Sequence, residues 1–403
     1  MRTDRSRRLA GRLISALLLF FALQNIYAIV RLSPLMANGA GDFKIFRTAA
    51  AIIASGHRQM LFDYPTQAAV QQQVYPDYPV GNNPLPYNHP SFEALLFLPL
   101  APFSNTTAYL AWLACNVLLL VASLWLLAPA LASLRELSLL PIAVIVLAFY
   151  PVGAALLHGQ DSLLSLFLYA LTFFYLQRGR DGAAGAVLAL GLFKPQLVLP
   201  FVVLAFIGER RWRALRWFSI AGSGLVAVST AVTGWNGAAR FIDLGFLLQK
   251  YRPWLFNPRL MANIRGFTES LMPGAEVFRT ALIVVASVAV LAFTFFHQRK
   301  IARPDLRFAL QVTATVLVSY HLYPYDLALM LIPLLLVANA GVTGGMRDQW
   351  LPLSAVGALL ISPLHTWLVS DQRYAWMSLA AASLFVALSR SGALSPRDAA
   401  VVR

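Results

Sequence analysis

Long runs of apolar residues recur along the whole chain, and they limit its possible folds more than any other feature. The run at 106–131 contains no charged residue, and runs of similar length lie at 13–32 and 277–297. About 20 apolar residues are enough for a helix to cross a bilayer. Inside the bilayer every backbone N–H and C=O group must be hydrogen-bonded within the protein, which favours helices. The sequence therefore predicts an all-α polytopic membrane protein.

The composition supports this class. Hydrophobic residues make up 59% of the 403 positions and charged residues 12%, whereas a soluble domain carries about 25% charged residues. Because the apolar runs occur throughout, we expect one integral membrane domain over residues 1–403. The first run is longer than a signal-peptide core of about 7–15 residues, and no small-residue cleavage site follows it. We interpret it as a retained first span.

The distribution of basic residues predicts the orientation. We expect about twelve spans. With this threading, 20 of the 32 Lys and Arg residues lie on the same side of the membrane as the N-terminus, and the other 12 lie elsewhere. Since basic residues accumulate in cytoplasmic segments, both termini should be cytoplasmic in a plasma (inner) membrane. Two long outer loops then cover about 33–90 and 235–276. The expected spans are 13–32, 106–131, 139–157, 162–177, 182–193, 195–208, 214–234, 277–297, 308–322, 324–342, 351–370 and 374–389.

Several functional classes are disfavoured. The net charge of +15 does not indicate a nucleic-acid partner, because the basic residues form short clusters between spans. Cys115 is the single cysteine, so disulfides and thiolate metal sites are excluded. The chain contains no His-x-x-x-His and no Asp-x-Asp, and we expect no metal and no other cofactor. It also lacks a glycine-rich phosphate loop, which disfavours a nucleotide-driven pump.

Four short polar segments interrupt the apolar runs. With twelve spans, all four lie at the outer face of the membrane. Unrelated polar accidents would be scattered over both faces, so the pattern predicts one outward-facing (periplasmic or extracellular) site that contacts membrane lipids. The segments are 41–44, 158–161, 191–196 and 319–327.

The first two segments offer a carboxylate and an amide. Asp42 precedes a predicted helix at 45–54, where it is either a helix cap or a carboxylate that binds a sugar or acts as a base. In the segment from His158 to Asp161, the position of Asp161 is explained by the preference for acidic residues at the start of a helix. Gln160 offers donors and acceptors at the mouth of the next helix. We therefore select Gln160 and His158 as substrate-binding candidates.

The other two segments offer a cation and a possible base. Lys194 lies beside the helix start at Pro195, an arrangement that favours a phosphate, although a lysine reaching to the membrane surface is the alternative. His321 is either a buried, hydrogen-bonded histidine or a base whose basicity the carboxylate of Asp326 raises. Asp326 and Tyr323 are further substrate-binding candidates.

Short motifs follow one another along the chain, some of them in these segments. They are Asp42 after the first span, Ala51-x-x-x-Ser55-Gly56, Leu61-Phe62-Asp63, the stretch Tyr87 to Leu100, Gly159-Gln160, Lys194-Pro195-Gln196 and His321-x-Tyr323-x-Tyr325-Asp326. In this order they resemble the glycosyltransferase 87 family, and the likeness covers most of the chain. One departure lies at Tyr87-Asn88-His89-Pro90-Ser91, where the family tends to have two adjacent prolines.

The resemblance implies a GT-C fold and a metal-independent sugar transfer at the outer face. This family includes a polyprenol-phosphate-mannose-dependent mannosyltransferase of phosphatidylinositol mannoside synthesis. The implied donor is thus a hexose, with mannose expected, on a polyprenyl phosphate, and the acceptor is a lipid or glycan. By the same resemblance, Asp42 and His321 take the catalytic positions. We expect inversion at the anomeric carbon, because no second carboxylate is clearly placed as a nucleophile.

Two other classes remain open at this point. A secondary transporter or polyprenyl-lipid flippase would use Asp42, His321 and Asp326 to relay protons. Such transporters usually place their binding groups near the bilayer midplane and are built from repeated halves. The polar segments here lie at one face, and the sequence contains no clear repeat. A non-catalytic assembly subunit is the third possibility.

Overall fold

The structure is a computed structural model that describes residues 2–78, 84–137, 139–251, 256–342 and 350–391. The described residues form helices joined by loops and short 3-10 or π turns, which confirms the expected helical class. The α-helices are α1 (Arg2–Leu35), α2 (Phe43–Ala54), α3 (Tyr64–Val74), α4 (Ser91–Phe97), α5 (Asn105–Leu127), α6 (Ala132–Leu137), α7 (Leu139–Ala148), α8 (Tyr150–His158), α9 (Ser162–Gln177), α10 (Asp181–Ala189), α11 (Pro195–Phe201), α12 (Trp212–Tyr251), α13 (Ile264–Leu271), α14 (Glu276–His297), α15 (Pro304–Val318), α16 (Leu331–Val342), α17 (Trp350–Leu360), α18 (Ser362–Ser370) and α19 (Ser378–Arg390).

Four helical segments of the described chain are long and apolar enough to cross a membrane. They are Arg12–Ala40, Asn105–Glu136, Trp212–Leu248 and Glu276–Lys300. Large apolar side chains on them are exposed, for example Phe20 in α1 and Val285 in α14. In a bilayer such residues face lipid, which is as apolar as they are. The four segments indicate a multi-pass membrane protein.

Shorter helices make up most of the remaining predicted spans. Helix α9 occupies the predicted range 162–177, and α10 and α11 lie on either side of Lys194 as expected. The predicted span 139–157 is instead divided into α7 and α8. Phe149 has an extended backbone and Pro151 supplies no N–H group, so the helix hydrogen bonding restarts there. The predicted span 351–370 is divided in the same way into α17 and α18, with Pro363 in the first turn of α18.

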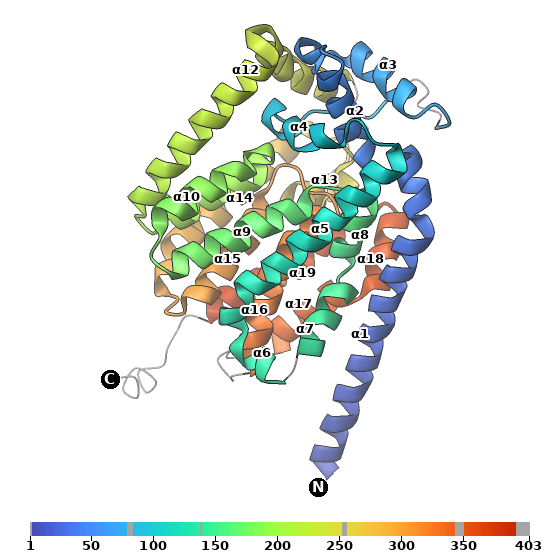
Figure 1. The fold of residues 1–403 in the computed structure, drawn as a ribbon. Helices are drawn as coiled ribbons and strands as arrows, with labels where there is room; N and C mark the ends of the chain where they lie inside the picture. Colours follow the sequence, from blue (N-terminus) through green and yellow to red (C-terminus); the bar gives the residue numbers. More distant parts are fainter. Residues whose placement is uncertain (1, 79–83, 138, 252–255, 343–349, 392–403) are drawn as a thin grey trace.

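Helices α2, α3 and α4 gather at the end of α1 that is remote from the N-terminus (Figure 1). They share an aromatic core in which Phe46 stacks on Phe97 with ring centroids 4.4 Å apart. The predicted helix 45–54 is confirmed in α2, which ends before Ser55 and Gly56. Helix α12 is kinked at Gly234, whose backbone is non-helical with a φ of 71°, and a second helical part follows, so the predicted loop 235–276 begins as a helix. The cap formed by α2, α3 and α4 lies next to the polar segments, since Asp42 at the start of α2 accepts a hydrogen bond from Gln160.

Candidate active site

The turn after α8 sets the position of the second polar segment. Gly159 has a φ of 63°, in the left-handed region that glycine accepts readily. A Cβ atom at this position would lie 2.8 Å from the Cβ of Phe43, so α2 packs directly on the turn. Trp112 Nε1 donates to the carbonyl of Gly159 at 3.0 Å, and Asn116 Nδ2 donates to the carbonyl of Gln160 at 3.1 Å. Helix α5 therefore holds the turn against α2.

This turn directs two side chains at Asp42. Gln160 Nε2 donates to Asp42 Oδ2 at 2.8 Å, and His158 Nδ1 lies 3.9 Å from the same oxygen. Asp42 occupies the cap position of α2, yet its side chain makes no capping hydrogen bond. The capping alternative is therefore wrong. The carboxylate is 23% exposed, so it remains accessible from the space in front of it.

Lys194 lies at the centre of a buried ion cluster. Its Nζ atom is 2.5 Å from Asp161 Oδ1, 2.5 Å from Asp326 Oδ1 and 3.0 Å from Ser162 Oγ. Burial by itself lowers the pKa of Lys194, but the two carboxylates outweigh it and raise the pKa above its usual value. An ammonium group has three N–H donors, and here three oxygens surround it. The surface-reaching alternative for Lys194 is therefore wrong.

Asp161 thus does more than begin a helix. Its side chain makes no capping hydrogen bond to α9 and pairs with Lys194 instead. Asp326 is held equally firmly, because its Oδ1 accepts from Ser162 Oγ at 2.8 Å and its Oδ2 accepts from the backbone N–H of Tyr323 at 3.1 Å. The cluster therefore joins the starts of α9 and α11 to the fourth polar segment.

His321 lies in the loop after α15, between aromatic rings. Its ring meets those of Phe256 and Tyr323 edge to face, with centroid distances of 5.7 and 4.6 Å. Among the described residues its buried Nδ1 has no hydrogen-bond partner. Burial lowers the pKa of His321 to about 4, although the carboxylate of Asp326 raises it. Asp326 thus acts in the predicted direction, but burial outweighs it, and the imidazole is neutral at physiological pH.

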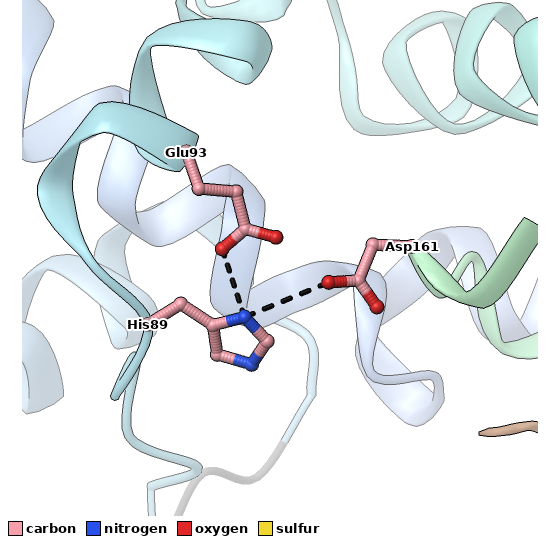
Figure 2. Close-up of side chains that lie close together, drawn as sticks. All are labelled: His89, Glu93 and Asp161. Carbon is pink, nitrogen blue, oxygen red and sulfur yellow. Dashed lines mark ion pairs between the residues drawn. The ribbon is translucent and has the colours of Figure 1, made fainter. Parts of the chain in front are cut away.

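A second cluster, which the sequence did not predict, is formed by His89, Glu93 and Asp161 (Figure 2). His89 Nδ1 lies 2.8 Å from Glu93 Oε2 and 3.6 Å from Asp161 Oδ2. The side chains of Glu93 and Asp161 are fully buried. The His-x-x-x-Glu spacing could have drawn attention to the first pair, although His89 lies in the loop before α4 and only Glu93 is in the helix. Asp161 comes from a distant segment, so no local motif includes it.

The atoms of these three side chains lie within 4.8 Å of one another, close enough to hold a metal ion. Because the three residues come from two distant segments, they form none of the local spacings that metal sites commonly use. Lys194 already provides a cation beside Asp161.

One cavity of about 1070 Å³ brings the predicted residues together. All seven sequence candidates line it, although they come from segments up to 284 residues apart in the chain. His89, Tyr150 and Asn257 line it as well. Helix α12 contributes apolar residues such as Leu225 and Val226 together with the hydroxyl residues Ser229, Thr230 and Thr233. The seven candidates are Asp42, His158, Gln160, Lys194, His321, Tyr323 and Asp326.

Comparison with known protein families identifies the class of this site. A model described as glycosyltransferase family 87 matches residues 87–320, more than half of the chain. The chain belongs to glycosyltransferase family 87. It is therefore a membrane glycosyltransferase, and the transporter and assembly-subunit alternatives are set aside. None of the curated proteins and none of the solved structures matches the chain.

Only some of the residues that line the cavity of this family 87 enzyme lie within the range that the family model matches. His89, His158, Gln160 and Lys194 lie within it, whereas Asp42 precedes it and the segment from His321 to Asp326 follows it. The fold is what adds these flanking residues to the site. Family 87 membership establishes sugar transfer but does not specify the donor, the sugar or the acceptor.

Proposed function

We propose that the enzyme transfers a hexose, mannose being the expected sugar, from a polyprenyl-phosphate donor to a lipid or glycan acceptor. The observation that carries the proposal is the two-sided character of the cavity. Its polar side contains Asp42, Gln160 and Lys194, and its apolar side includes Leu225 and Val226 of the long apolar helix α12. A lipid-linked sugar has the same division, since its tail requires an apolar wall and its sugar requires hydrogen-bonding groups.

Asp42 is the proposed catalytic base. Its carboxylate would accept the proton of the acceptor hydroxyl while that oxygen forms a bond to the anomeric carbon and the bond to the donor phosphate breaks. The polyprenyl phosphate leaves with the bonding electron pair. A single displacement of this kind inverts the anomeric centre. The 2.8 Å hydrogen bond from Gln160 Nε2 to Oδ2 leaves Oδ1 available for the acceptor.

His321 and Tyr323 are proposed to contact the sugars. A neutral imidazole can accept or donate a hydrogen bond to a hydroxyl, and the rings of His321, Tyr323 and Phe256 form an aromatic surface beside it. His158, 3.9 Å from the carboxylate of Asp42, would contact the acceptor. Lys194 and Asp326 are proposed to position the loops of the site, because their polar atoms are occupied by one another and by Ser162.

We further propose twelve spans, cytoplasmic termini and a periplasmic or extracellular cavity. Helix α1 leads from the N-terminus to the π turn η1 (Met36–Ala40), and Gly41 separates that turn from Asp42. The cap of α2, α3 and α4 lies at that remote end (Figure 1). If α1 crosses the membrane once, the cavity opens on the face opposite the N-terminus. The positive-inside distribution supports the same orientation.

A transfer assay tests the proposal. Purified protein would be incubated with a panel of radiolabelled polyprenyl-phosphate sugars and with lipid and glycan acceptors. We expect release of free polyprenyl phosphate together with a labelled product, and retention of activity in EDTA. Transfer from a nucleotide sugar, with none of the polyprenyl-phosphate donors consumed, would contradict the proposal.

A further inference from the structure

The proposed donor brings a negatively charged phosphate into a cavity whose lysine is already occupied. Lys194 Nζ has three oxygen neighbours within 3.0 Å, as many as it has N–H groups. A phosphate oxygen would have to displace one of them. Among the described lining residues there is no arginine. The remaining possible cations in the described wall are the histidines His89, His158 and His321.

The surroundings of these three histidines differ. His321 lies between aromatic rings and is neutral. His158 is one-third exposed and lies 3.9 Å from a single carboxylate, that of Asp42, which is the proposed base. His89 has two carboxylates at one nitrogen: Glu93 Oε2 at 2.8 Å and Asp161 Oδ2 at 3.6 Å. Charge proximity therefore favours the protonated form most strongly at His89.

The orientation of the His89 ring is also fixed. Its ring stacks on Tyr87 with centroids 5.7 Å apart and meets Phe46 edge to face at 5.5 Å. Tyr87 Oη in turn donates to Glu93 Oε2 at 3.2 Å, which holds the carboxylate in place. Nδ1 points at the two carboxylates, whereas Nε2 lies on the far side of the ring, away from both (Figure 2). His89 lines the cavity, so Nε2 is the atom that can meet a substrate.

We propose that His89, as an imidazolium, is the direct ligand of the donor phosphate: Nδ1–H is held by Glu93 and Asp161, and Nε2–H donates to a phosphate oxygen. This assignment rests on the proposed function. The ligand class is an isoprenyl phosphate ester, and Glu93 acts as a positioning residue. A charge-assisted hydrogen bond of this kind stabilises the departing phosphate without giving up its proton.

The charges around His89 are consistent with the assignment. Two carboxylates, those of Asp161 and Asp326, contact the single ammonium group of Lys194. Glu93 adds a third carboxyl group beside His89 and Asp161, and burial raises the pKa of Glu93 to about 8, so this buried acid cluster favours the binding of a further proton. Burial by itself lowers the pKa of His89 and Lys194 lowers it further, but the carboxylates of Glu93 and Asp161 outweigh them and raise it. Tyr87, on the same loop, stacks against the ring, and His321 is close enough for its charge to interact with that of His89.

A binding experiment on the full chain in lipid nanodiscs tests the assignment. The probe is farnesyl methyl phosphate, a phosphodiester that carries one negative charge at every pH from 5.5 to 8.5 and has no sugar to transfer. Farnesol is the uncharged control ligand. The variants are His89→Gln, Glu93→Gln and, as a matched control outside the cavity, the exposed His57→Gln. Thermal unfolding of each variant confirms that it is folded.

We expect the wild-type affinity for the phosphodiester to fall as the pH rises through the pKa of His89. At low pH, His89→Gln should bind about 10-fold more weakly, and its affinity should not change with pH. Glu93→Gln should shift the fall to lower pH, because one carboxylate no longer supports the proton. His57→Gln should behave as wild type, and farnesol should bind all four proteins equally.

Two outcomes would overturn the assignment. In the first, His89→Gln binds the phosphodiester as wild type does at every pH, while the transfer assay still consumes polyprenyl-phosphate sugars. In the second, EDTA abolishes wild-type binding and Mg²⁺ or Mn²⁺ restores it, which would make the His89–Glu93–Asp161 cluster a metal site. Failure of the proposed function gives a different result, namely His89-dependent phosphodiester binding with no transfer from any polyprenyl-phosphate sugar.

Discussion

Exposure distinguishes Asp42 from the buried acids that pair with Lys194. Its side chain is 23% exposed, whereas those of Asp161 and Asp326 are at most 2% exposed and are paired with Lys194. A base must exchange its proton with substrate and solvent, and a carboxylate held at 2.5 Å by an ammonium group cannot do so easily. Accessibility therefore favours Asp42 as the base, on grounds independent of family resemblance.

For Asp42→Asn we expect kcat to fall by about 10²–10⁴, with little change in stability or phosphodiester binding. The amide has nearly the same shape as the carboxylate. Buried Lys44 loses the nearby negative charge of Asp42 but keeps its hydrogen bond to the carbonyl of Gly39. Turnover and melting temperature of purified protein measure the two effects, with exposed Asp77→Asn as the matched control. Near-normal turnover combined with a lower melting temperature would assign Asp42 a structural role.

His321 provides a prediction about pH. Burial lowers the pKa of His321 to about 4, so the imidazole is neutral from pH 5 to 8. Its titration therefore causes no loss of activity on the acidic side of the pH–rate profile in that range. His321→Gln should therefore lower turnover while leaving the shape of the pH–rate profile between pH 5 and 8 unchanged. Turnover per folded molecule is the measurement. If the wild-type profile contains an acidic limb near pH 6 that this variant removes, His321 is the base after all.

At the scale of elements, the turn between α8 and α9 decides where Gln160 points. Gly159→Ala would place a methyl group 2.8 Å from Phe43 and impose a left-handed backbone on alanine, which costs about 1–2 kcal/mol. We expect lower stability together with a larger loss of turnover, because Gln160 moves away from Asp42.

Gly179→Ala is a matched control for that variant. Gly179 has a φ of 66°, close to that of Gly159, and lies beyond the other end of α9 with no atom near the added methyl group. It should lose stability through backbone strain alone and keep its turnover per folded molecule. Equal losses of turnover in the two variants would contradict a role for the turn in directing Gln160.

The elements also indicate what the sequence could predict. Helix α9 and the flanks of Lys194 follow from apolar run length and from Pro195. The division between α7 and α8 does not, because proline is tolerated at many positions within membrane helices. Asp161 looks like an ordinary helix start, and its ion pair with Lys194 depends on how α9 packs. His89 lies in the predicted outer loop and Glu93 just after it, and no local pattern indicates that Asp161 of a distant segment packs against both.

At the scale of the whole molecule, the orientation can be measured. Cysteines at the exposed positions Gln72 and Ala275, in a Cys115→Ser background, should react with a membrane-impermeant thiol reagent in intact cells. Cysteines at the exposed positions Arg180 and Ala302 should react only after permeabilisation. Labelling of Arg180 in intact cells would contradict the proposed twelve-span topology.

The ion cluster around Lys194 affects how variant libraries of this enzyme should be read. The cluster joins three segments, so removing Lys194, Asp161 or Asp326 leaves a buried charge without its partner, at a cost of about 3–5 kcal/mol. Cells would degrade much of such protein. A screen that counts product alone would rank these positions with Asp42. Scoring abundance beside product would separate them, with Asp42 variants abundant and inactive and cluster variants scarce.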